Sequence, residues 1–475
     1  VRSGVDASCV SGLCHGGGVT GDMTVLQGYR FALDPSPEQE AMLRSHCGAQ
    51  RKAFNWRLGL VKANLDQRAA ERSYGLGEDE LTPLVGWSAY GLRHGWNQTK
   101  DIVAPWWREN SNEAYSSGLA NLAAGLSNWA KSRSGNRGGA RVRFPRFKSK
   151  RSAMSCRFTT GAFGLVDTDR RHVQLPRIGQ IRTHESTRKP ARHLERGTGR
   201  IRSATVSFTR GRWFVSFSVE VQRHEVRPPE HCEVVGVDLG ITHLAVLSQP
   251  VPGISDCHGM VANPRHLEHA QRALRRLQRE AARRRGPDRR TGTKPSKRWQ
   301  QSNAKITKLH AKVANCRADG LHKLTTALAD RFGTVVVEDL NVAGMLRNRR
   351  LARGIADAGW AELRRQLEYK MGWRSGVVAV ADRWYPSSKT CNACGVVKAK
   401  LRLSDRLFCC DACGYRTDRD LNAARNLAAL ASRIPHSASS PSCGATKNEP
   451  DGRPGKTSFV GNGHRHGNTP EVNVA

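Results

Sequence analysis

The stretch VVGVDLGITHLAVLS at residues 234–248 and the stretch TVVVEDL at residues 334–340 decide the fold of this chain. Each is an apolar run with the length of a buried strand, and Gly240 divides the first run into two strands. Helical patterns follow at residues 321–332, 360–371 and 421–430, and residues 376–381 (GVVAVA) predict another strand. Strands that alternate with helices indicate an α/β domain.

Three carboxylates stand at the ends of these predicted elements. Asp238 precedes Leu239-Gly240, Glu338 closes the run VVVE, and Asp420 lies near the start of the helix in TDRDLNAARNL. Carboxylates that converge repel one another unless divalent cations neutralise them, and oxygen ligands of this kind suit Mg²⁺. We therefore expect the three acids to hold two Mg²⁺ ions for phosphodiester hydrolysis, in which one ion activates water and the other stabilises the leaving oxygen.

Each acid has a simpler interpretation when it is taken alone. A single aspartate at a strand end is commonly a cap or turn residue, and Asp339 and Asp418 compete for the same role. The segment VDLGIT is also similar to the phosphate-binding Asp-x-Gly-x-Thr turn of actin-like and sugar-kinase folds. The chain has no second glycine-rich phosphate motif in a strand context to support a kinase.

The charge of the chain indicates a polyanionic partner. Its 475 residues contain 77 Lys and Arg against 41 Asp and Glu, a net charge of +36. This exceeds the charge that solubility requires, so we expect binding to nucleic-acid phosphates. Residues 134–151 (SGNRGGARVRFPRFKSKR) predict a basic arm, and residues 265–312, with 16 Lys or Arg and three acids, predict a basic helical hairpin. No run of about 18 apolar residues predicts a membrane span.

Four cysteines have the spacing of a zinc ribbon: Cys391, Cys394, Cys410 and Cys413. Four thiolates close the coordination shell, so the zinc ion is expected to be structural. Gly395 and Gly414 follow the two C-x-x-C pairs, where turns often need positive φ. Cys409 is expected to point away from the ion. Two paired motifs argue against a redox C-x-x-C, and the clustered cysteines and the absence of a signal-like start favour the cytoplasm.

The first half of the chain predicts a sheet interrupted by helices. A strand is expected at residues 25–33, helices at 38–58 and 112–130, and a hairpin of an antiparallel, barrel-like sheet at 202–221, with its turn at Arg210-Gly211. The tryptophans at positions 56, 87, 96, 106, 107 and 129 are interpreted as helix-bundle core, with base stacking as the alternative.

Several motifs together resemble the TnpB (OrfB-type) proteins of insertion sequences, relatives of the type V CRISPR effectors. The matching stretches are YRFALDPSPEQE, FPRFKSK, GVDLGITHLAVLS, VVVEDLNVAGM, DAGWAELRRQLEYK, DRWYPSSKTCNACG and CCDACGYRTDRDLNAARNL. The resemblance covers about residues 23–430 and implies a transposon-encoded nuclease, guided by an RNA from the transposon end, that cuts double-stranded DNA beside a short flanking motif. Asp238, Glu338 and Asp420 match the family's catalytic acids, and Arg419 and Asn422 are candidates for positioning backbone or strand.

The resemblance also implies a domain order. A RuvC-like, RNase H-type nuclease domain is expected at residues 229–385 and 415–432, with a zinc ribbon inserted at 386–414. A wedge-like β-barrel is expected at 23–50 and 133–228, interrupted by a helical recognition domain at 51–132. Residues 1–22 are expected to be a disordered prefix or a misassigned start, and residues 433–475 a disordered tail.

Two other functions remain open at the level of sequence. The same acidic fold could join DNA ends as a transposase that catalyses strand transfer. Alternatively, the chain could bind nucleic acid and regulate transposition without cutting it. The presence of all three acids favours a nuclease over a regulator.

Overall fold

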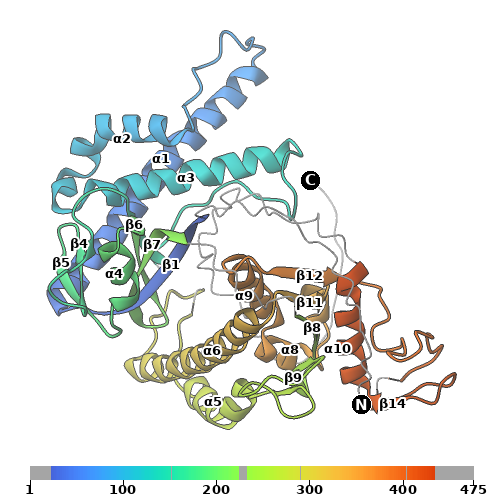
Figure 1. The fold of residues 1–475 in the computed structure, drawn as a ribbon. Coiled ribbons are helices and arrows are strands. Elements are labelled where there is room, and N and C mark those ends of the chain that lie inside the picture. Colours follow the sequence, from blue (N-terminus) through green and yellow to red (C-terminus); the bar gives the residue numbers. More distant parts are fainter. Residues whose placement is uncertain (1–22, 151, 224–232, 289, 403, 434–475) are drawn as a thin grey trace, which may run out of the picture.

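The computed structural model describes residues 23–150, 152–223, 233–288, 290–402 and 404–433. The expected prefix and nearly all of the expected tail lie outside these residues. In Figure 1 a sheet with three long helices forms the N-terminal half, and a second, smaller sheet packed between helices forms the C-terminal half. The fold is therefore mixed α and β, and each half has its own hydrophobic core.

The N-terminal sheet is antiparallel and has the strand order β2-β6-β7-β1-β5-β4-β3. Its strands are β1 (Met23–Asp34), β2 (Met154–Phe158), β3 (Gly164–Leu165), β4 (His172–Leu175), β5 (Gly179–Thr183), β6 (Gly199–Thr209) and β7 (Arg212–Arg223), with helix α4 (Arg188–Glu195) before β6. The predicted hairpin is confirmed: β6 and β7 meet at Arg210 and Gly211, both with positive φ. Within the described residues, β2 and β3 are open edges, so the sheet is not closed by hydrogen bonds into the barrel that we expected.

Three helices pack beside this sheet: α1 (Pro37–Ser73), α2 (Ala89–Val103) and α3 (Asn112–Arg133), with the 3-10 helix η1 (Pro105–Glu109) between the last two. A capping box of Ser36 and Gln39 starts α1. The expected domain boundary after residue 50 falls inside α1, which begins at Pro37. Helices α1 and α3 touch at Gly118, where a Cβ atom would lie 2.3 Å from the carbonyl oxygen of Gln50.

The tryptophans of this region pack mainly into the helix bundle, as predicted. Trp96 is buried and stacks on Tyr115 with ring centroids 5.2 Å apart. Trp129 meets Phe144 edge to face at 5.0 Å. Trp106 is the most exposed of them, at 38%, and lines a hollow of about 620 Å³ beside α1.

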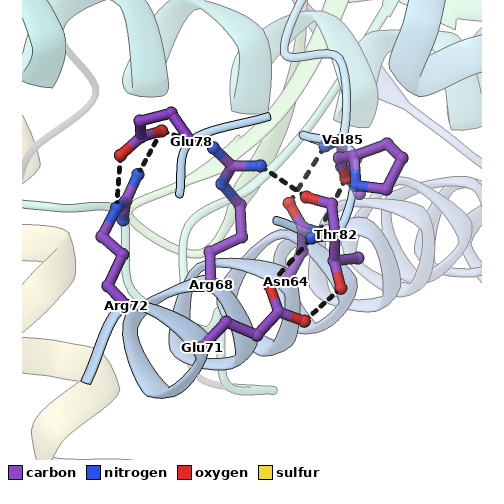
Figure 2. Close-up of polar contacts among 8 residues, drawn as sticks. Asn64, Arg68, Glu71, Arg72, Glu78, Thr82 and Val85 are labelled. Atoms are coloured by element: carbon purple, nitrogen blue, oxygen red, sulfur yellow. Dashed lines mark hydrogen bonds and ion pairs between the residues drawn. The ribbon is translucent and has the colours of Figure 1, made fainter. Parts of the chain in front are cut away.

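The far end of α1 is extended by a loop that folds back on it (Figure 2). Glu78 of this loop accepts hydrogen bonds from Arg68 and Arg72, and Glu71 accepts one from the backbone N–H of Thr82 at 2.8 Å. Asn64 donates to the carbonyl of Pro83 and accepts from the N–H of Val85, both at 3.0 Å. These contacts fix residues 78–85 along the polar end of the helix.

The basic arm contains no helix or strand among its described residues, and it packs against the helices. Asn55 of α1 accepts a hydrogen bond from the backbone N–H of Lys148 and donates one to its carbonyl, both at 2.8 Å. The Lys148 ammonium lies 4.1 Å from the centre of the Phe54 ring. The arm is therefore docked on α1 by its backbone.

The C-terminal sheet has the strand order β10-β9-β8-β11-β12. Its strands are β8 (Val234–Leu239), β9 (His243–Leu247), β10 (Met260–Ala262), β11 (Thr334–Glu338) and β12 (Val377–Ala381). Strands β8, β9 and β10 are antiparallel neighbours, whereas β8, β11 and β12 run parallel. Residues 234–248 and 334–340 thus form β8, β9 and β11, the three inner strands of one sheet.

Helices cover both faces of this sheet (Figure 1). Helix α10 (Arg419–Ala429), followed by η2 (Leu430–Arg433), packs on one face, and α6 (Lys297–Arg331) and α9 (Trp360–Gly372) pack on the other. Helix α5 (His266–Ala282) lies along α6, which confirms the predicted helical hairpin. The short helices α7 (Val342–Met345) and α8 (Ala352–Ala358) follow β11. Among the described residues no helix has the length and apolar character of a membrane span.

The cysteine-rich segment leaves the sheet after β12 and returns to it at α10. Its two short strands, β13 (Leu407–Cys409) and β14 (Arg416–Asp418), are antiparallel. Strand β14 lies beyond residue 414, where we expected the inserted module to end.

Candidate active site and metal centre

Strand pairing brings Asp238 and Glu338 to equivalent positions on neighbouring strands. Val237 of β8 pairs with Val337 of β11, so the next residue on each strand is an acid. Side chains of parallel strands in register point to the same face. Both carboxylates are half-buried at the carboxyl ends of their strands, where the sheet opens to the loops that follow.

The face that they share is the one covered by α10. Val336 lies two residues before Glu338, and its side chain packs against Leu427 of α10. Gly236 lies two residues before Asp238, and a Cβ atom there would be 1.9 Å from the carbonyl oxygen of Ala424. Only glycine therefore lets α10 lie directly on β8.

Asp420 is in the first turn of α10, so this packing brings it to the same end of the sheet. The preceding Asp418 caps the helix: one of its carboxylate oxygens accepts the backbone N–H of Asp420 at 2.9 Å and that of Leu421 at 3.0 Å. Asp420 itself accepts hydrogen bonds from the Arg419 guanidinium at 2.8 and 2.9 Å. The carboxylate of Asp418 is thus engaged by the helix backbone, whereas that of Asp420 pairs with the arginine side chains of Arg419 and Arg406.

The electrostatics show that the three carboxylates are close enough to interact. The pKa of Asp238 is raised well above its ordinary value, first by burial and then by the negative charges of Glu338 and Asp420. The pKa of Glu338 is also raised, mainly by burial and in part by Asp420, while a hydrogen bond from Ser387 opposes the rise. Gathered carboxylates of this kind favour a bound cation.

The other competing acid, Asp339, is neutralised. Its carboxylate forms ion pairs with Arg364 at 3.0 Å and with Arg383 at 2.5 Å. These two guanidinium groups lower the pKa of Asp339. The residue therefore holds α9 and the segment after β12 to the end of β11.

The ligand atoms of the three acids are farther apart than those of the cysteine cluster. Within the described ranges, the only group of at least three His, Cys, Asp or Glu whose ligand atoms all lie within 4.8 Å of one another is the cysteine cluster. The ligand atoms of the three carboxylates are therefore not all within that distance of one another. Carboxylate oxygens are the ligands that hard divalent cations prefer.

The four predicted cysteines converge as expected from their spacing. Their Sγ atoms lie within 4.8 Å of one another, with 3.7 Å between Cys391 and Cys413 and 3.6 Å between Cys394 and Cys410. Tetrahedral bonds of about 2.3 Å to zinc place sulfur atoms about 3.8 Å apart. The cluster could therefore hold a metal ion, and the glycines that follow each pair, Gly395 and Gly414, have φ values of 77° and 70°.

Cys409 is not part of this group. It lies in β13, and its carbonyl accepts a hydrogen bond from Lys398 at 2.9 Å. The thiol is half-buried and outside the cluster of four.

Three residues connect the cysteines to the acids: Asn422, which the sequence offered as a positioning residue, and Ser387 and Asn426, which it did not. Ser387 donates a hydrogen bond to Glu338 at 2.8 Å. Asn426 of α10 donates to the backbone carbonyls of Ser387 and Thr390. Asn422 donates to the carbonyl of Thr390 and accepts from the N–H of Asn392, so it positions backbone on both sides of Cys391.

The helical hairpin beside the sheet presents a row of exposed cations. Arg272, Arg276 and Arg279 are all exposed on α5, at the spacing of one helix face. Their charges can neutralise phosphates of a nucleic acid.

Family models match three parts of the chain. Residues 216–349 match the model described as "Probable transposase" (OrfB_IS605), and residues 360–427 match "Cas12f1-like, TNB domain". Residues 23–69 match "Helix-turn-helix domain" (HTH_OrfB_IS605). In this chain residues 23–69 form strand β1 and most of the single helix α1.

Relatives that match this chain over most of their own length are among the known proteins. The chain is 40% identical to a "Putative RNA-guided DNA endonuclease" of Mycobacterium tuberculosis (strain CDC 1551 / Oshkosh), over 85% of this chain and 86% of the relative. It is 32% identical to the protein of that description named InsQ from Escherichia coli (strain K12), over 86% and 92%. A solved complex described as Cas12f1-sgRNA-target DNA aligns with a TM-score of 0.46 and 13% identity, over 85% of this chain and 99% of that one.

Proposed function

Since this chain belongs to the OrfB (IS605) transposase family, we propose that it is an RNA-guided DNA endonuclease that cuts DNA at Asp238, Glu338 and Asp420. Relatives described as RNA-guided DNA endonucleases match it along most of its length. The proposal is supported by the register that places Asp238 and Glu338 at equivalent strand positions, and by the effect of Glu338 and Asp420 on the pKa of Asp238. An antiparallel trio of strands extended by two parallel strands supports a RuvC-like, RNase H-type nuclease domain.

Asp238, Glu338 and Asp420 would hold two Mg²⁺ ions. When bound, such ions supply a metal-activated water and stabilise the charge that develops on the leaving oxygen. Asp238 and Glu338 are fixed by the sheet, and Arg419 orients Asp420 from within the same helical turn. The acids therefore meet the backbone of the DNA in a preformed arrangement.

The remaining parts of the chain have separate roles in the proposal. Cys391, Cys394, Cys410 and Cys413 would hold one structural Zn²⁺ ion in the inserted module. The N-terminal sheet corresponds to a wedge-like domain, and α1 to α3 to a helical recognition domain. The basic arm and the α5–α6 hairpin would bind the guide RNA and its duplex with target DNA by backbone charge, while base pairing reads the sequence. The protein itself would read only a short flanking motif.

The proposal is tested with protein purified together with its co-expressed RNA. A plasmid library carries a guide-matched target beside randomised flanks, and Mg²⁺ is added or withheld. We expect cuts only in matched targets with one flank, and the cut site should move when the guide sequence is changed. Joined DNA ends without any guide RNA would instead indicate strand transfer.

Asp238→Ala and Asp319→Asn are compared in the same assay. Asp319 is an exposed acid of α6 whose partner Lys323 is also exposed, so this surface ion pair contributes little to the stability of the protein. Asp238→Ala should abolish cutting and Asp319→Asn should retain it. Binding of RNA and DNA without any cutting by the wild type would indicate a non-cleaving regulator.

A further inference from the structure

Ser387 contacts one of the proposed catalytic acids from outside the sheet. Its hydroxyl donates a hydrogen bond of 2.8 Å to Oε1 of Glu338, across 49 residues of sequence. Ser387 is only 5% exposed, so water does not readily replace this donor. The hydrogen bond engages one carboxylate oxygen of Glu338 and restricts the rotation of the carboxylate.

The backbone of Ser387 is held in turn by α10. Its carbonyl accepts a hydrogen bond of 2.7 Å from Nδ2 of Asn426, which is 4% exposed. Its N–H donates to the carbonyl of Tyr385 at 2.8 Å. Ser387 therefore has little freedom to turn away from Glu338.

The same helix fixes the entry to the cysteine module. The carbonyl of Thr390 accepts from Asn426 at 2.6 Å and from Asn422 at 2.7 Å, and the N–H of Asn392 donates to Asn422 at 3.1 Å. Cys391 lies between these two anchored residues. One run of backbone, residues 387–392, thus joins Glu338, the cysteine cluster and the helix that carries Asp420.

We propose that Ser387 is a positioning residue that sets the orientation of Glu338 for cation binding, and that the docked segment 387–392 makes this orientation depend on the cysteine module. This inference rests on the proposed function, because it concerns how the same acidic site is organised. Hydrogen-bond partners of metal-ligating carboxylates typically change metal affinity 10- to 100-fold when they are removed.

Manganese binding to the full chain tests the inference without any cleavage. Mn²⁺ is titrated into zinc-loaded protein free of RNA and DNA, and the free ion is measured by electron paramagnetic resonance. The binding that Asp238→Asn removes defines the acidic site. Ser387→Ala should weaken this binding about tenfold, whereas Ser387→Thr, which keeps the hydroxyl, should bind as the wild type does.

Ser404→Ala is the matched control, because Ser404 is an exposed serine of the same module that bonds only weakly to Asp405, at 3.5 Å. It should leave Mn²⁺ affinity unchanged. Zinc content and melting temperature are measured for every variant, and Ser387→Ala should match the wild type in both. A loss of zinc or of thermal stability in Ser387→Ala would assign the residue a purely structural role and overturn the inference.

The inference and the proposed function fail in different ways. If Ser387→Ala binds Mn²⁺ as the wild type does, while the wild type cuts guided DNA, only the positioning role is wrong. If Ser387→Ala weakens Mn²⁺ binding but the wild type does not cut guided DNA, the positioning role stands and the nuclease assignment fails. If the wild type shows no binding that Asp238→Asn removes, both are wrong.

Discussion

Gly236 lies so close to Ala424 that a Cβ atom on the glycine would be 1.9 Å from the alanine carbonyl oxygen. This contact seats α10 on β8. It thereby places Asp420, in the first turn of the helix, over the end of the strand that carries Asp238. The geometry of the proposed active site thus depends on a glycine that takes no part in its chemistry.

Gly236→Ala should therefore displace α10 and disable the site. Forcing a methyl group against backbone typically costs about 1–3 kcal/mol and sometimes more. We expect a lower melting temperature and a loss of guided cleavage of at least tenfold. Gly28→Ala in β1 is the control, because a Cβ atom there would have nothing within 4 Å and φ is not positive. Equal cleavage by both variants would contradict the role of the Gly236 contact.

Loss of zinc should impair the acidic site at a distance. Cys413→Ser removes one thiolate of the cluster, so bound zinc should fall from one ion per chain to almost none. Because residues 387–392 connect the cluster to Glu338, cleavage should fall about tenfold or more even though the sheet remains folded. Zinc analysis and a cleavage time course measure both effects.

Cys409→Ser is the matched control for this experiment, since Cys409 is a neighbouring cysteine outside the cluster. It should keep its zinc and its activity. Full cleavage by a zinc-free Cys413→Ser protein would show that the module does not support the acids.

The basic hairpin should contribute mainly salt-dependent binding. Replacing Arg272, Arg276 and Arg279 by Gln removes three exposed charges from one face of α5. If each contacts a phosphate, the slope of log K against log salt should decrease by about two to three units. Lys323→Gln on α6 is the control, because Lys323 already pairs with Asp319. An unchanged slope in the triple variant would remove α5 from the nucleic-acid interface.

The buried amine of Lys370 should give the C-terminal half a measurable pH dependence. Burial, helped by the charge of Arg374, lowers the pKa of Lys370 to about 8. An unfolded lysine titrates near 10.4, so between these two values the unfolded chain binds more protons than the folded one. Stability from this group should therefore rise as the pH rises from about 8 to about 10.

Melting curves of the wild type and Lys370→Met measure this contribution. The difference between the two melting temperatures should grow in favour of the wild type across that pH range. Parallel curves would mean that Lys370 keeps an ordinary pKa. Its hydrogen bonds to Thr325 and Thr326, both 2.7 Å, would then stabilise the charged form fully.

The sequence predicted the elements whose hydrophobic pattern is strong. Strands β8, β11 and β12 are apolar runs that could be buried only within a sheet, and α3 has an unbroken apolar stripe. Helix α2 was missed, since only Leu92 and Trp96 of it are buried. The second half of α1 was missed because it is polar. Its end is held by contacts with the following loop, in which Asn64 of the helix binds Pro83 and Glu78 of the loop binds Arg68 (Figure 2).

Part of the candidate site was predicted because local sequence patterns mark its residues. Asp238 and Glu338 were identifiable because strand ends mark them, and the cysteines because their spacing does. Asp420 needed the family resemblance to separate it from Asp418, whose capping role depends on where α10 begins. The contact of Ser387 with Glu338 joins residues far apart in sequence, so no local pattern could indicate it.

The most direct test of the central claim is guided cleavage of a matched plasmid by Asp238→Asn, Glu338→Gln and Asp420→Asn, each purified with its RNA. These substitutions keep the size of the side chain and remove its charge. The account predicts that each variant binds guide RNA and target DNA as the wild type does and cuts at least a thousandfold more slowly in Mg²⁺, an effect of about 4 kcal/mol on the barrier. Cleavage at the wild-type rate by any of the three would contradict the account.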